Sequence, residues 1–217
     1  MLKRLALVAL LGVSALARPI SHQDLFDFQW IGEVRVSPGG QQAVFVKTVV
    51  DAKRTGYETS LWIMDLPRGK PRPLTYGTKD RAPRFSPDGS KLAFVRNGAL
   101  ALMPLDGGEA QLISDLPRPV SAPFWSPDGR QLAFLCDAVE EDNRPKKDGY
   151  VSDVNVVTRA HYRVNGGGDL NFKRHRHVWV QGLTRTRATA LTHGSFDDSD
   201  PQFAPDGSLF FACDPRA

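Results

Sequence analysis

Arginines and histidines in the second half of the sequence are the side chains best suited to binding an anion. Arg159 and Arg163 stand four positions apart, so in a strand they share one face and could pair with a peptide carboxylate. Residues 173–177 read Lys-Arg-His-Arg-His, a cluster that could bind a carboxylate, a phosphate or a metal ion. No cysteine or carboxylate stands at metal-ligand spacing from it, so we predict no metal site. Solvent exposure is the favoured interpretation of both groups.

Carboxylates gather at two other points. Asp197, Asp198 and Asp200 are hard oxygen donors that could bind a cation, but they come immediately before a predicted strand. A polar connection between two sheets is therefore the favoured interpretation. Glu140 and Glu141 lie in a charge-rich loop, and we interpret them as part of a solvated surface. The sequence thus predicts no cofactor.

Two cysteines, Cys136 and Cys213, stand at the same position in successive copies of a sequence repeat described below, just after its hydrophobic run. A disulfide needs α-carbons within about 7 Å, whereas equivalent points on sheets packed about 10 Å apart are too distant. We therefore expect two free, partly buried thiols. Neither has a histidine at a spacing that indicates a nucleophile, so no catalytic residue is predicted.

A repeated hairpin must position these side chains. Its clearest copies span residues 84–95 and 124–135, and looser copies span 36–46 and 203–212. Each contains Ser-Pro-Asp-Gly or a near variant, in which proline supplies a φ near −65° and glycine the positive φ that closes a type I turn with a bulge. The predicted turn residues are Ser37, Pro38 and Gly40; Ser86, Pro87, Asp88 and Gly89; Ser126, Pro127, Asp128 and Gly129; and Pro205, Asp206 and Gly207.

The hydrophobic run after each turn predicts how the hairpins pack. Residues 92–95 and 132–135 are apolar at every position, so both faces of their sheets must be covered. Leu92 and Phe94 share one face of their strand, and Ala93 lies on the other. Small antiparallel sheets stacked face to face produce this pattern, which is typical of the blades of a β-propeller.

We therefore predict an all-β fold: an incomplete propeller of four-stranded antiparallel blades. The blades are placed at residues 33–75, 82–114 and 122–192, the last with an insertion at 137–177, followed by the first hairpin of a fourth blade at 200–217. Residues 18–32 are predicted to hold a short helix over 21–29, which Phe26 and Trp30 could extend, with Ser21 and Asp24 as its capping box. Three blades and a half-blade are expected to leave one apolar sheet face exposed.

The first residues predict export of the chain. Residues 1–17 combine a basic start, an apolar segment and Ala15-Leu16-Ala17, which is typical of a secretory signal peptide. The mature protein is expected to be periplasmic or secreted with no stable membrane anchor, although an uncleaved anchor is an alternative. The net charge of +4 is spread along the chain without a recognition motif, so no nucleic-acid partner is predicted.

Residues 83–89 (Pro-Arg-Phe-Ser-Pro-Asp-Gly) with Leu92-Ala93-Phe94 resemble the propeller repeat shared by TolB and the prolyl oligopeptidase (S9) family of serine peptidases. Residues 157–168, 174–180 and 191–201 resemble the acylaminoacyl-peptidase and dipeptidyl-aminopeptidase-like branch. The resemblance implies an amino-terminal propeller that limits entry of peptides to an α/β-hydrolase domain bearing Ser, Asp and His.

No part of that hydrolase machinery is found in this sequence. The resemblance implies a Gly-x-Ser-x-Gly nucleophile elbow, but Ser14, the one serine two residues after a glycine, lacks the second glycine. The chain is therefore expected to be inactive alone and to meet peptides through a missing C-terminal hydrolase domain, as the first part of a peptidase cut short. The alternative is a TolB-like module that binds a protein or peptide.

Overall fold

The computed structural model describes residues 19–138, 175–184 and 187–213 of the 217-residue chain. The predicted signal peptide and most of the predicted insertion at 137–177 lie outside these residues. So do Arg159, Arg163, Glu140 and Glu141, and no outcome for them is given. Within the described part, no helix is long and apolar enough to cross a membrane.

The described residues form three four-stranded antiparallel sheets and a two-stranded sheet, each built in chain order. A short 3-10 helix, η1 (His22–Asp27), precedes them. The first sheet contains β1 (Gln29–Val36), β2 (Gln42–Val50), β3 (Tyr57–Asp65) and β4 (Arg72–Pro73). The second contains β5 (Asp80–Phe85), β6 (Lys91–Arg96), β7 (Ala99–Pro104) and β8 (Gln111–Leu112). The third contains β9 (Val120–Trp125), β10 (Gln131–Cys136), β11 (His177–Gly182) and β12 (Thr189–Ala190), and the last β13 (Asp198–Phe203) and β14 (Leu209–Cys213).

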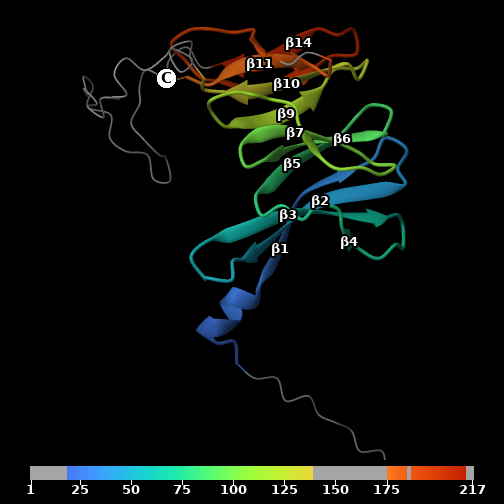
Figure 1. Ribbon diagram of the computed structural model, residues 1–217, viewed down its shortest axis with the longest axis vertical. Helices are drawn as coiled ribbons and strands as arrows, with labels where there is room; N and C mark the ends of the chain where they lie inside the picture. Colours follow the sequence, from blue (N-terminus) through green and yellow to red (C-terminus); the bar gives the residue numbers. More distant parts are fainter. Residues whose placement is uncertain (1–18, 139–174, 185–186, 214–217) are drawn as a thin grey trace, which may run out of the picture.

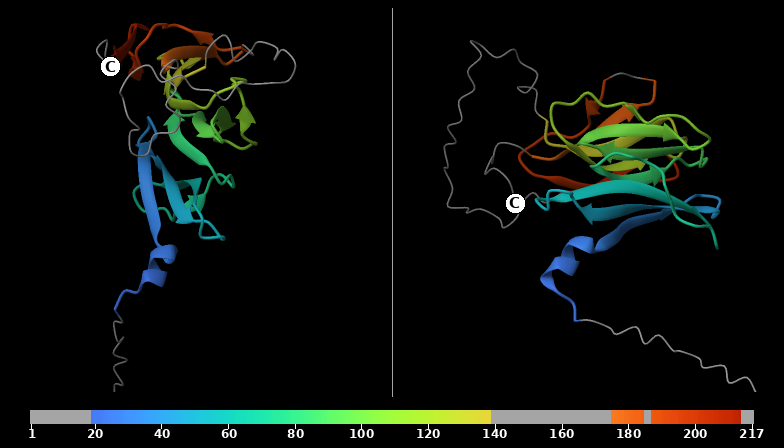
Figure 2. Two further views of the ribbon diagram at one scale, coloured as in Figure 1. Left: turned by 90° about the vertical axis from the view of Figure 1, so that its left-hand side faces the viewer. Right: turned by 60° about the horizontal axis from the view of Figure 1, so that its bottom comes forward.

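The sheets stack one on another along the molecule (Figures 1 and 2). Their first strands converge, because β1 contacts β5, β5 contacts β9 and β9 contacts β13. Three of the first strands, β5, β9 and β13, also pack on the second strand of the sheet before them. This radial arrangement of small antiparallel sheets is that of β-propeller blades, so the predicted fold class is confirmed.

The core lies between the sheets. Leu92 and Phe94 are fully buried and pack with Val44 and Val46 of the first sheet. Ala93, on the opposite face of β6, belongs to a second cluster with Leu132, Phe134 and Trp125 of the third sheet. The run after each turn therefore covers two interfaces at once, which explains why it is apolar at every position.

Each first strand contains a bulge that the sequence did not reveal. The backbone has a positive φ, between 48° and 53°, at Glu33, Ala82, Ala122 and Asp200. At each of these residues the pairing with the next strand shifts register. The blades were predicted to begin at these four residues, but the strands begin earlier, at 29, 80, 120 and 198. Trp30 accordingly lies in β1 and does not extend the helix.

The helix before the first sheet is also shorter than predicted. Its Ser21 and Asp24 form the capping box, with the Ser21 N–H donating to Asp24 Oδ2 at 2.6 Å. Phe28 already has extended backbone, so the helix ends at Asp27 where residue 29 was expected. No residue of η1 is buried, which leaves the helix on the surface.

The two thiols differ in burial. Neither forms a disulfide among the described residues. Cys136 is buried in the second core cluster, where its Sγ donates to the carbonyl of Arg118 at 3.5 Å, whereas Cys213 is exposed. The expectation of two partly buried thiols was therefore wrong in degree. The difference arises because β10 lies between β9 and β11, whereas β14 has a single strand neighbour among the described residues.

The Ser-Pro-Asp-Gly turns are held by their own side chains. In the second sheet Gly89 has φ +73° and its N–H donates to the Ser86 carbonyl at 2.9 Å. The Ser86 hydroxyl donates to Asp88 Oδ1 and accepts from the Lys91 N–H at 2.9 Å. Ser126 and Asp128 repeat this network in the third sheet. The turn of the first sheet lacks the aspartate, because residue 39 is glycine, and the turn of the last sheet lacks the serine, because residue 204 is alanine.

The turn predicts how acid affects stability. Hydrogen bonds from Ser86 and Ser90 lower the pKa of Asp88 from 3.8 to about 2. Because the folded carboxylate is more acidic than the unfolded one, its stabilisation is complete above pH 3.8 and is lost as the pH falls through about 2. In urea unfolding of Asp88→Asn, the destabilisation seen at pH 6 should shrink by pH 2. An equal loss at both values would contradict this, and Asp106→Asn serves as the control.

Candidate functional site

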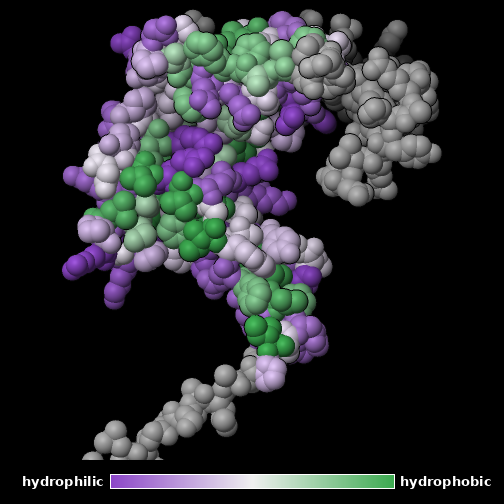
Figure 3. Space-filling view, turned by 180° about the vertical axis from the view of Figure 1, so that it is seen from behind, coloured by the Kyte–Doolittle hydropathy of each residue, from purple (hydrophilic) through white to green (hydrophobic). Residues whose placement is uncertain are grey.

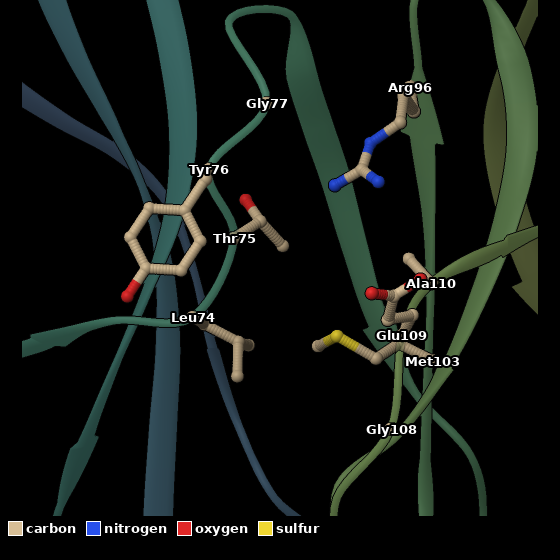
Figure 4. Close-up of a pocket in the computed structure, with 9 residues that line it drawn as sticks. All are labelled: Leu74, Thr75, Tyr76, Gly77, Arg96, Met103, Gly108, Glu109 and Ala110. Carbon is tan, nitrogen blue, oxygen red and sulfur yellow. The ribbon is translucent and has the colours of Figure 1, made fainter.

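A cavity of about 550 Å³ opens between the outer parts of the first and second sheets. We call it the interblade slot. One wall is the chain that follows β4, and the other is formed by β6, β7 and the loop before β8. Its lining residues are Leu74, Thr75, Tyr76, Gly77, Arg96, Met103, Gly108, Glu109 and Ala110. Figure 4 shows Leu74 and Met103 pointing toward each other across the slot, with the charged ends of Arg96 and Glu109 directed into it.

A hydroxyl fixes the wall that comes from the first sheet. Thr75 is buried, and its Oγ1 accepts a hydrogen bond from the Leu61 N–H at 3.0 Å. Ser114 and Thr192 do the same at the ends of the next two sheets, accepting from the N–H groups of Leu100 and Val178 at 2.7 and 2.8 Å. This repeated anchor gives an internal alignment of the three outer edges.

An ion pair with a buried carboxylate forms the end wall of the slot. The Asp80 carboxylate is fully buried and accepts two hydrogen bonds from Arg96, at 2.9 Å from Nε and 2.8 Å from Nη2. These bonds raise the pKa of the Arg96 guanidinium, which also lies 5.1 Å from the centre of the Phe94 ring. Such a bidentate pair fixes the guanidinium in one orientation.

Gly77 is required by this ion pair. A Cβ at residue 77 would stand 2.5 Å and 2.6 Å from the two carboxylate oxygens of Asp80, which Arg96 holds in place. Gly77→Ala is expected to lower the free energy of unfolding by about 1–3 kcal/mol, because the pair must shift. Gly32→Ala is the matched control, since nothing lies within 4 Å of its Cβ. Equal urea midpoints for the two variants would contradict the argument.

A second polar cluster joins the third and last sheets. The Asp198 carboxylate is buried, accepts a hydrogen bond from the Thr192 hydroxyl and lies 3.3 Å from Nδ1 of His177. Asp197 accepts a hydrogen bond from the Arg176 N–H at 2.9 Å. Both carboxylates thus serve the connection between sheets, in agreement with the favoured interpretation. The described residues contain no group of three or more histidines, cysteines or carboxylates placed to hold a metal ion.

Sequence reasoning did not identify the interblade slot or Asp80. The available signal was a pair of similar segments, residues 74–80 (Leu-Thr-Tyr-Gly-Thr-Lys-Asp) and 191–198 (Leu-Thr-His-Gly-Ser-Phe-Asp-Asp). In both segments a threonine whose hydroxyl anchors the sheet edge is followed by a buried aspartate at the start of the next sheet. The similarity of the two segments could not reveal the partners of these aspartates, because Arg96 and His177 lie outside the segments.

Apolar side chains are exposed on both end sheets. On β1 they are Trp30, Ile31, Val34 and Val36, and on β14 they are Phe210 and Phe211. Figure 3 shows hydrophobic side chains over the first sheet, over η1 and over the sheets at the other end. The sequence predicted one exposed apolar sheet face, and the structure shows exposed apolar side chains on two sheets. These residues occupy positions that are covered by a neighbouring sheet elsewhere in the stack.

Comparison with known proteins relates this stack to peptidase propellers. Residues 37–119 match the family model described as dipeptidyl peptidase IV (DPP IV) N-terminal region. The uncharacterized peptidase YuxL of Bacillus subtilis (strain 168) is 30% identical over 199 residues, which cover 87% of this chain. The chain spans 30% of the length of that curated relative.

Two solved structures show the same fold. Acylaminoacyl peptidase of Pyrococcus horikoshii is 17% identical with a TM-score of 0.56, over 77% of this chain and 25% of that one. TolB of Acinetobacter baumannii is 19% identical with a TM-score of 0.51, over 81% of this chain and 35% of that one. These two structures show the fold alone, and the sequence matches relate this propeller region to the N-terminal domains of S9 peptidases.

Proposed function

We propose that this chain is the non-catalytic propeller portion of a secreted or periplasmic S9-type serine peptidase, and that it limits the access of peptides to a hydrolase domain. The observation that carries the proposal is the alignment with YuxL. It extends over 87% of this chain but only 30% of a protein named as a peptidase. In this proposal the remaining length holds the catalytic domain.

The chemistry of the chain supports a non-catalytic role. Acyl transfer needs a nucleophile, a base that activates it and donors for the oxyanion. The 217 residues contain no Gly-x-Ser-x-Gly elbow. Among the described residues, the buried histidine and carboxylate, His177 and Asp198, are joined to Thr192, whose hydroxyl already serves as the anchor of the sheet edge. The peptide bond would therefore be cleaved by groups of another domain.

The exposed end sheets support a larger assembly of blades. A propeller blade buries an apolar face against each neighbour, and natural propellers use about four to eight blades. Ile31 is 66% exposed and Phe210 is 62% exposed, at opposite ends of the stack. Further blades of the same kind would cover both side chains and complete a ring around the passage to the hydrolase. Export is proposed from the signal-like residues 1–17.

The test is to isolate the natural product from its source cells with an antibody against the propeller. We expect a protein much larger than 23.9 kDa, located outside the cytoplasm, that reacts with a fluorophosphonate probe for active-site serines. It should cleave short peptide substrates and leave intact casein uncut, because the propeller restricts entry. A product of about 23.9 kDa or less that does not react with the probe would overturn the proposal and favour an interaction module of the TolB kind.

A further inference from the structure

We propose that the interblade slot is a binding site for a peptide that carries a leucine-sized apolar side chain next to a lysine or arginine. This inference goes beyond the proposed function, since the slot lies at the outer edge of the sheets. Its volume of about 550 Å³ falls within the range of ligand pockets. Its floor is apolar, formed by Leu74, Met103 and Ala110.

The next junction along the stack shows one side chain that fills this space. Counting from the hydroxyl anchors, Gly77 of the first sheet corresponds to Leu116 of the second. Leu116 packs against the core between the second and third sheets, together with Leu183. At residue 77 there is no side chain, and Asp80 leaves no room for one. The slot therefore lacks the leucine present at the next junction, and the third anchor, Thr192, is likewise followed two residues later by a glycine, Gly194.

A second filling residue also differs between the two junctions. Met103 stands three residues after Leu100, and Gln181 stands three residues after Val178, so the two are equivalent. At the second junction the Gln181 amide donates to the Ile113 carbonyl and bridges the two sheets. At the first junction Met103 reaches toward Leu74 without such a bridge (Figure 4). An apolar side chain supplied by a ligand would take the place that Leu116 occupies at the equivalent junction.

The charges around the slot select the rest of the ligand. Arg96 is neutralised by Asp80, which binds two of its nitrogens. Glu109 is exposed, points into the slot, and has no ion-pair partner among the described residues. The slot therefore presents one uncompensated negative charge beside an apolar floor. A basic residue next to the apolar one would place its cation against Glu109.

Tyr76 leaves the entrance open. Its side chain is 91% exposed, and Figure 4 shows the ring directed away from the space between the two sheets. An aromatic ring on a connecting segment can turn through its side-chain torsions without disturbing the Thr75 anchor. In the bound state it would cover the apolar part of the ligand.

The experiment uses the full-length protein labelled with ¹³C at the methionine methyl groups, after treatment with a serine-directed inhibitor so that no peptide is cleaved. The probe is acetyl-Gly-Leu-Lys-Gly-amide. We expect a saturable shift of the Met103 methyl signal, assigned with Met103→Leu, and none of the Met64 signal. Met64 is the internal control because it occupies the equivalent position of the first sheet. No shift of Met103 at millimolar peptide would overturn the proposal.

Variants test the two parts of the recognition separately. Glu109→Gln should weaken binding about fivefold, the effect of one partly exposed ion pair, and Asp106→Asn in the same loop should leave it unchanged. Ala110→Leu should fill the slot and abolish binding while the Met64 signal stays as in the unmodified protein. Peptides with serine for leucine, or glutamate for lysine, should bind at least tenfold more weakly. Equal binding by either peptide would contradict the proposal.

The outcome is independent of the proposed peptidase role. The serine-directed inhibitor occupies any hydrolase site, so the peptide cannot bind there. A Met103 shift that is weakened by Glu109→Gln therefore reports binding in the interblade slot. Conversely, loss of the fluorophosphonate reaction would leave the Met103 shift unaffected. Each proposal can therefore fail alone.

Discussion

Phe134→Ala is expected to lower the free energy of unfolding by about 3–5 kcal/mol, the cost of a large cavity in a packed core. Phe134 is completely buried on β10 and contacts the core between the second and third sheets. Its strand has neighbours on both sides, β9 and β11, so the backbone has little freedom to collapse into the space. Urea unfolding followed by tryptophan fluorescence measures the change.

The control is Phe211→Ala. Phe211 holds the equivalent position on β14, since Leu209 pairs with Phe203 as Leu132 pairs with Trp125. It is 42% exposed, so its removal should cost less than about 2 kcal/mol. If the two substitutions cost the same in the full-length protein, Phe211 must be covered there by another part of the protein. Equal and small losses would contradict the stacked-sheet core.

The stacking of the sheets could be predicted because it depends on residues close together in sequence. A Ser-Pro-Asp-Gly turn fixes a hairpin within a few residues, and the run at 92–95 shows that both faces of the hairpin are covered. The structure places Leu92 and Phe94 in one core cluster and Ala93 and Val95 in the other, as the alternation along the strand required.

The bulges could not be predicted, because their residues give no local signal. A positive φ is normally a property of glycine, yet it is adopted here by Glu33, Ala82, Ala122 and Asp200. The conformation coincides in every case with a register shift between the first strand and the second strand of the same sheet. Recurrence at the same place in all four sheets indicates that the bulge belongs to the fold and not to any one of these side chains.

The interblade slot escaped prediction for a related reason. An empty junction is visible only when the residue that fills the next one is known, and the alignment of Gly77 with Leu116 depends on the hydrogen bonds of Thr75 and Ser114. A glycine in a loop ordinarily indicates a turn. Here it indicates the close approach of the buried Asp80 carboxylate.

The Asp80–Arg96 pair provides the second large effect. Arg96→Met is expected to lower the free energy of unfolding by about 3–5 kcal/mol, because it leaves a fully buried carboxylate without its partner. Asp80→Val should cost less, about 1–2 kcal/mol, since the Arg96 side chain is 26% exposed and can reach water. The two losses should not add.

The third sheet shows why the double variant should recover stability. The register that pairs Asp80 with Arg96 pairs Val120 with Cys136, so an apolar pair already occupies the same place in this chain. Asp80→Val with Arg96→Met copies that pair, and apolar replacement of a buried ion pair is often neutral or stabilising. The double variant should therefore be at least about 2 kcal/mol more stable than Arg96→Met alone in urea unfolding. Losses that simply add would show that Asp80 and Arg96 act separately, and the end wall of the slot would then need another explanation.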